Sequence, residues 1–150
     1  MNMTAHFSYA ELIASEYAIR HGINNHPVSN DVLSNLHVLA DGLERVRTVL
    51  RMPMHISSGY RSAKVNAGVG GSKSSKHMLG LAADFHLAGV PPLDVCKALI
   101  QHSEIGFDQL IQEGTWVHIS FPEPEHDPAG IVLTAIFKVG HPTTYVKGLV

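Results

Sequence analysis

SNDVLSNLHVLADGLERVRTVL, residues 29–50, is the stretch that decides the fold. Its apolar side chains recur every three or four residues over about five helical turns. They are Val32, Leu33, Leu36, Leu39, Leu43, Val46 and Leu50. That spacing predicts a helix with one apolar face packed in a core. Ser29 suits the position before the first turn, and Pro53 ends the helix.

A second helical signal lies upstream of this stretch. Ser8 and Glu11 have the spacing of a capping box, which predicts a helix that begins after Ser8. Leu12 and Tyr17 continue the helical spacing, and Gly22 is expected to end the helix.

Downstream of Pro53 the chain reads mostly as short strands. Apolar runs between turn-forming residues predict strands at 54–58, 81–87, 107–112, 116–121 and 131–139. A third helix is expected to begin at Pro91-Pro92 and to run to about residue 103. Helices first and strands afterwards predict an α+β fold with a small antiparallel sheet packed against about three helices.

Two connections stand out in this pattern. Residues 62–76, rich in Ser, Gly and Lys, are expected to form an active-site loop without an element of its own. Glu113-Gly114-Thr115 is expected to be the turn of a hairpin between two strands.

Length and composition fit one ordinary globular domain over residues 1–150. The chain is 45% hydrophobic and 16% charged. Its formal net charge of −2 gives no basic excess, so we expect no nucleic-acid partner. Cys96 is the single cysteine, which excludes an internal disulfide and a cysteine-based zinc site, and its apolar neighbours favour a buried position. The sequence does not indicate an oligomeric state.

The N-terminal sequence MNMTAHFS has neither the basic nor the apolar region of a signal peptide. The chain also contains no run of about 18 apolar residues, so no membrane span is expected. We therefore expect cytoplasmic synthesis, and a target in the cell wall would have to be reached by other means.

Three residues have the composition of a catalytic metal site. His77 lies on a loop, Asp84 follows seven residues later in a strand, and His118 lies in the middle of another strand. Two imidazoles and one carboxylate can hold a zinc ion and leave a position open for water. Asp84 and His118 both have apolar neighbours, and a buried carboxylate is costly unless it is paired or bound to metal. A buried Asp84–His118 ion pair explains this polarity equally well, so the spacing leaves both interpretations open.

Three further residues have two interpretations each. Arg61, at a strand end, has the chemistry to bind a substrate carboxylate or carbonyl oxygen, but surface arginines are more common. Ser75, close to His77, is either a substrate contact or a solvated loop residue. Trp116 shares the face of His118 in a regular strand and either walls a pocket or fills the core.

Three segments together resemble the zinc D-alanyl-D-alanine carboxypeptidase family of metallopeptidases. They are SGYR (residues 58–61), GGS with SKHMLGLAAD (residues 70–72 and 75–84), and WVHIS (residues 116–120). The closest similarity is to the short branch of that family, which is common in phages and prophages. The resemblance covers nearly the whole chain and implies one Zn²⁺ per chain. It also implies a peptidoglycan peptide as substrate and a phage or prophage origin.

The resemblance also implies roles for individual residues. His77, Asp84 and His118 match the zinc ligands. Arg61 matches the arginine that binds the substrate carbonyl and stabilises the developing oxyanion. Ser75 matches a serine near the substrate backbone. These matches favour the metal interpretation over the buried ion pair.

The chain departs from the family at the general base. In much of the family a Glu or Asp stands three residues before the last histidine ligand, where this chain has Thr115. Glu113 is the nearest carboxylate and the expected base, with Asp108 and Glu104 as reserves. An odd offset from His118 puts Glu113 on the opposite face of one continuous strand, so a bulge or wide turn is expected to bring it inward.

The expected function is metal-assisted hydrolysis of a stem-peptide bond, of the D-alanyl-D-alanine carboxypeptidase type. One alternative is an L-alanyl-D-glutamate endopeptidase that uses the same site on another bond. Another is a non-catalytic zinc module that binds the cell wall or belongs to a phage particle. Thr115, at the usual position of the base, favours this alternative.

Overall fold

The computed structural model describes residues 2–150, which form five α-helices, two 3₁₀ helices and a six-stranded sheet. The α-helices are α1 (Tyr9–Ile13), α2 (Glu16–His21), α3 (Asn30–Leu50), α4 (Ala63–Gly68) and α5 (Pro92–Leu99). The 3₁₀ helices are η1 (Lys76–Leu79) and η2 (Ser103–Ile105). The strands are β1 (His55–Ser58), β2 (Ala82–His86), β3 (Gln109–Gln112), β4 (Val117–Ser120), β5 (Ile131–Ile136) and β6 (Thr144–Lys147).

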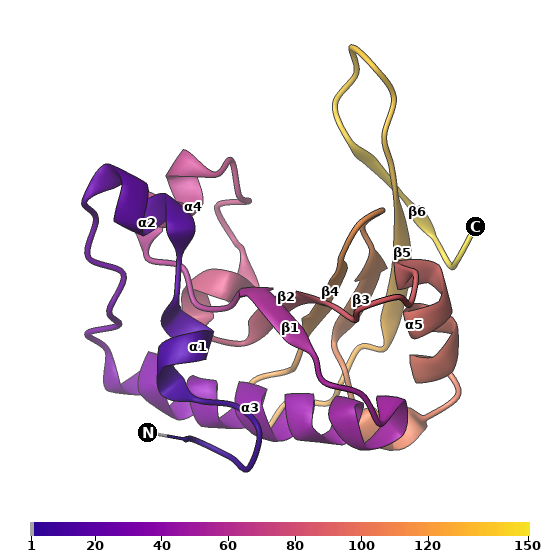
Figure 1. Ribbon diagram of the computed structural model, residues 1–150, viewed down its shortest axis with the longest axis horizontal. Coiled ribbons are helices and arrows are strands. Elements are labelled where there is room, and N and C mark those ends of the chain that lie inside the picture. The colour runs from indigo at the N-terminus through magenta and orange to yellow at the C-terminus, as the bar shows by residue number, and fades with distance from the viewer. Residues whose placement is uncertain (1) are drawn as a thin grey trace.

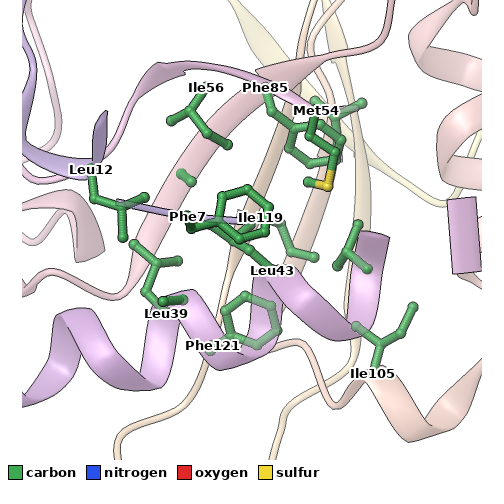
Figure 2. Packing of buried hydrophobic residues seen from close by; sticks show 14 of the residues in the cluster. Phe7, Leu12, Leu39, Leu43, Met54, Ile56, Phe85, Ile105, Ile119 and Phe121 are labelled. Atoms are coloured by element: carbon green, nitrogen blue, oxygen red, sulfur yellow. The ribbon is translucent and has the colours of Figure 1, made fainter. Parts of the chain in front are cut away.

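The long helix α3 runs along one face of the sheet and confirms the predicted core helix (Figure 1). Ser29 caps its first turn, and Arg51 ends it in a left-handed conformation. Its buried side chains belong to one hydrophobic cluster with the side chains of one sheet face. Figure 2 shows Phe7, from the chain before α1, among the side chains of α3 and the sheet. Helix α5 packs on α3, β3 and β4, with Cys96 buried as expected.

Gly42 allows α3 to approach the end of β4 closely. A Cβ atom at this position would overlap the ring of Phe121, which is fully buried. The missing side chain therefore lets an aromatic ring fill the space between helix and sheet.

The upstream helix differs from the prediction because it is divided. The capping box of Ser8 and Glu11 is present, but α1 ends at Ile13. Ser15 then caps a second helix by accepting a hydrogen bond from the Ala18 amide, and Gly22 ends α2 as expected. Helical spacing alone does not reveal such a break, because Ile13 and Tyr17 keep a four-residue interval across it.

The expectation for residues 62–76 was wrong in part, because this segment contains helix α4. Ser62 caps it by accepting a hydrogen bond from the Val65 amide, and Val65 is buried. A helix of fewer than two turns with one buried apolar residue is too short to produce a detectable hydrophobic period.

The α+β fold class is confirmed, but the sheet is mixed rather than antiparallel. Its strand order is β1-β2-β4-β3-β5-β6, and β3 and β5 run parallel. The pairs β1–β2, β2–β4, β3–β4 and β5–β6 are antiparallel. Strand β6, whose residues are all exposed, was not expected. No helix within residues 2–150 has the length and apolar character needed to cross a membrane.

Candidate active site

The sheet register places the candidate site on the face that points away from α3. Asp84 pairs with His118, and His118 pairs with Ile111 on the next strand. Directly paired residues share a face, so these three side chains lie on the same side of the sheet. Their neighbours Phe85, Ile119 and Leu110 point to the opposite side, into the core. One face of the sheet thus forms the core and the other forms the floor of a cleft of about 750 Å³.

His77, Asp84 and His118 converge at the floor of this cleft. Asp84 Oδ1 lies 2.9 Å from His118 Nδ1 and 3.3 Å from His77 Nε2. One possible ligand atom from each residue lies within 4.8 Å of the other two. A tetrahedral zinc ion with bonds of about 2.0–2.1 Å has its ligand atoms roughly 3.3 Å apart. The three side chains therefore form a possible metal site of the right size.

The hydrogen bonds of His77 show why a metal fits this site. Its Nδ1 lies 2.7 Å from the carbonyl oxygen of Gly59, which only accepts, so Nδ1 carries the proton in the neutral ring. Nε2 is then a lone-pair acceptor that faces Asp84 Oδ1, a second acceptor. Nε2 is buried and has no hydrogen-bond partner among residues 2–150. A cation between these two atoms would satisfy both of them.

Burial and mutual contact set the charges in this group. His77 is 2% exposed, and burial lowers its pKa, while the neighbouring Asp84 opposes the shift. Asp84 is 8% exposed, and burial alone would raise its pKa. The contacts with His118 and then His77 outweigh burial, so the pKa of Asp84 lies well below its usual range. A neutral imidazole and an ionised carboxylate are the forms that bind a divalent cation.

Arg61 lies beside the possible metal ligands and is held there by three side chains. Its Nε donates to Ser58 Oγ at 3.2 Å, and its Nη1 donates to Asn66 Oδ1 at 3.1 Å. Its Nη2 lies 3.4 Å from Asp84 Oδ2. Asn66, on α4, is buried and also donates to the carbonyl oxygen of Ser72. Part of the guanidinium's hydrogen-bonding capacity remains free for a group in the cleft.

Glu113 lines the same cleft, but it does not arrive there through a bulge. Its amide donates to the carbonyl oxygen of Trp116 at 3.0 Å, which closes the hairpin between β3 and β4. Because Ile111 pairs with His118, the residue two positions beyond Ile111 shares the His118 face. The offset along a single strand predicts the opposite face, but Glu113 and His118 lie on opposite arms of the hairpin.

The surroundings of Glu113 raise the pKa of its carboxyl group above the usual value of a glutamate. Burial raises its pKa, and the charge of Asp84 adds to this shift, whereas His118 and Arg61 oppose it. A carboxyl group with a raised pKa is a better proton acceptor in its ionised form.

Ser75 and Trp116 both line the cleft. Ser75 Oγ accepts a hydrogen bond from the His77 amide, so it also positions the loop that carries this histidine. Trp116 is half-buried at the hairpin and lies on the same face of the sheet as His118.

The two reserve carboxylates have other partners. Asp108 lines the cleft but forms an ion pair with Lys76 at 2.9 Å. Glu104 is exposed, bonds to His102 and is not part of the cleft.

Residues 5–120 match the family model described as Peptidase M15. The chain belongs to the Peptidase M15 family. This M15 match confirms the resemblance to the zinc D-alanyl-D-alanine carboxypeptidase type, and it indicates a peptidase. It covers His77, Asp84, His118, Arg61 and Glu113, and it ends before β5 and β6. No curated protein matched the chain.

Proposed function

We propose that this M15 peptidase is a zinc-dependent hydrolase of the peptidoglycan stem peptide, with D-alanyl-D-alanine carboxypeptidase specificity. The observation that carries the proposal is the convergence of His77, Asp84 and His118 in a cleft that also contains Arg61 and Glu113. We also propose that residues 1–150 form a single zinc peptidase domain. The phage or prophage origin and the wall substrate rest on the resemblance to the short branch of the family.

The three possible ligands would hold one Zn²⁺. The ion would supply a Lewis acid for the scissile carbonyl and increase the acidity of a bound water molecule. His77 Nε2 has its lone pair available because Gly59 fixes the proton on Nδ1. Arg61 holds Asp84 from the other side through Oδ2.

Glu113 and Arg61 perform the remaining steps. Glu113 accepts a proton from the attacking water as the new C–O bond forms, and it passes the proton to the leaving amine nitrogen as the C–N bond breaks. Arg61 donates hydrogen bonds to the carbonyl oxygen while that oxygen gains negative charge. Ser75 and Trp116 bind the peptide on either side of this centre. Glu113 thus takes the role of the carboxylate that much of the family has at the position of Thr115.

Incubation with purified peptidoglycan, followed by mass spectrometry of the products, tests the proposal. The zinc-loaded chain is expected to release terminal D-alanine, and the Glu113→Gln variant serves as the inactive control. Cleavage between L-alanine and D-glutamate would instead show the endopeptidase activity. A folded, zinc-loaded protein that releases no product would support a non-catalytic wall-binding module and refute the peptidase proposal.

A further inference from the structure

The hairpin of β5 and β6 contributes to the cleft although it lies outside the residues that match the family. Leu133 on β5 and Tyr145 on β6 line the same cleft as the possible metal ligands. Figure 1 shows this hairpin, drawn in yellow, extending beyond the rest of the sheet. One wall of the candidate site is therefore built by the part of the chain after residue 120.

The strand register explains how Tyr145 reaches this position. Ile111 pairs with Leu133 in the parallel ladder, so Leu133 continues the row of Asp84, His118 and Ile111 across the sheet. Tyr145 pairs with Ala135, two residues beyond Leu133 and on the same face. Arg61 follows β1 at one edge of the sheet, whereas β6 forms the opposite edge. A ligand that spans the cleft would therefore have Arg61 at one end and Tyr145 at the other.

The hairpin is in contact with the turn that carries Glu113. A Cβ atom on Gly114 would lie 3.0 Å from Phe137 Cε2, so the ring of Phe137 packs over this turn. The hairpin that carries Tyr145 therefore packs against the turn that carries Glu113, and both residues line the cleft.

The chemistry of Tyr145 suits a contact with a peptide. Tyr145 is 50% exposed and lines the cleft, so a ligand in the cleft can reach its ring. Burial, together with the nearby carboxylates of Glu113 and Asp84, raises the pKa of its phenol. The hydroxyl therefore stays protonated at neutral pH and can donate a hydrogen bond to a carbonyl oxygen.

We propose that Tyr145 binds the peptide substrate at the end of the cleft opposite Arg61, with its hydroxyl on a backbone carbonyl and its ring against an apolar side chain. This proposal rests on the proposed function, because it names a further substrate contact in the same site. It makes the C-terminal hairpin a determinant of substrate affinity.

Steady-state kinetics of Tyr145→Phe and Tyr145→Ala test this inference on a stem pentapeptide ending in D-alanyl-D-alanine. Loss of one hydrogen bond in Tyr145→Phe should raise KM about three- to tenfold, with kcat within about twofold. Tyr145→Ala should raise KM further because the ring contact is also lost. Thr144→Ala is the matched control, since Thr144 is exposed on the same strand and faces the opposite side. Unchanged KM in both Tyr145 variants would overturn the inference.

Binding measurements separate this inference from the proposed function. If the wild-type chain releases no product, the peptidase proposal fails, and the dissociation constant of the same peptide is then measured by calorimetry on the zinc-loaded protein. Weaker binding by Tyr145→Phe than by Thr144→Ala would still support the inference. Equal binding by the two variants, or no binding by the wild type, would overturn it.

Discussion

Glu113 shows how much a single position depends on strand pairing. The residue was predicted as the base because it is the nearest carboxylate to His118, yet its offset along the chain argued against the correct face. The hairpin reverses the chain between Glu113 and His118, so the face is set by the register Ile111–His118. Sequence predicts the candidate here, but only the pairing shows that it reaches the cleft.

Glu113→Gln removes the proton acceptor and keeps the shape of the side chain. We expect kcat to fall by about 10²- to 10⁴-fold, the usual contribution of general base catalysis. Zinc content should not change, because Glu113 is not among the possible ligands. Peptide hydrolysis assays with metal analysis check both points, with Glu104→Gln as control because Glu104 is exposed and bonded to His102. Activity of Glu113→Gln within about twofold of wild type would refute the assignment.

The pH dependence of activity reports on the same residue. Because burial raises the pKa of Glu113, its active ionised form is lost at a higher pH than for an ordinary glutamate. We expect kcat/KM to fall as the pH decreases through that raised pKa. Kinetics between about pH 4 and 8, with bound zinc measured at each pH, separate this loss from release of the metal. Constant kcat/KM down to the usual range of a glutamate, with zinc bound, would contradict this role.

At the scale of elements, α4 is a short helix with a large effect on the site. It presents Asn66, which accepts a hydrogen bond from Arg61 and donates one to Ser72. Gly71 lies against this contact, and a Cβ atom there would overlap Asn66 Oδ1 and lie 2.9 Å from Arg61 Nη1. The lack of a side chain at Gly71 thus helps to hold Arg61 in place.

Gly71→Ala should displace Arg61 while leaving all three possible metal ligands in the chain. We expect kcat/KM to fall by about ten- to a hundredfold, since small misplacements of a catalytic group are costly. Zinc binding should persist, because His77, Asp84 and His118 are unchanged. Lys64→Ala, an exposed change on α4, the helix that carries Asn66, is the matched control. A Gly71→Ala variant with normal kcat/KM would show that Arg61 does not depend on this packing.

The elements differ in how well their sequences predict them. Helix α3 was predicted in full because its apolar period lasts through 21 residues and Ser29 caps it. Strand β6 was missed because all four of its residues are exposed and carry no burial pattern. The parallel pairing of β3 and β5 was also missed, since it depends on the path of the chain between residues 112 and 131 rather than on either strand.

At the scale of the whole molecule, the sheet separates two environments. One face packs on α3 and α5 in the hydrophobic core, and the other carries charged and polar groups from β2, β3 and β4 into the cleft. The core fixes the positions of Asp84 and His118, because the residues before and after each of them in its strand are buried in that core.

The sequence predicted these two residues and His77 through their polarity and motifs. The distances between them depend on the β2–β4 register, which no local pattern specifies.

Calorimetric titration of chelator-treated protein with Zn²⁺ tests the metal site most directly. We predict one zinc ion per chain for the wild type and no binding by His118→Ala, because that variant lacks one of three possible ligands. His86→Ala is the matched control, since His86 is exposed on the same strand as Asp84 and is not among the three. Circular dichroism establishes that the variants are folded. Wild-type zinc affinity in folded His118→Ala, or no zinc binding by the wild type, would contradict the site.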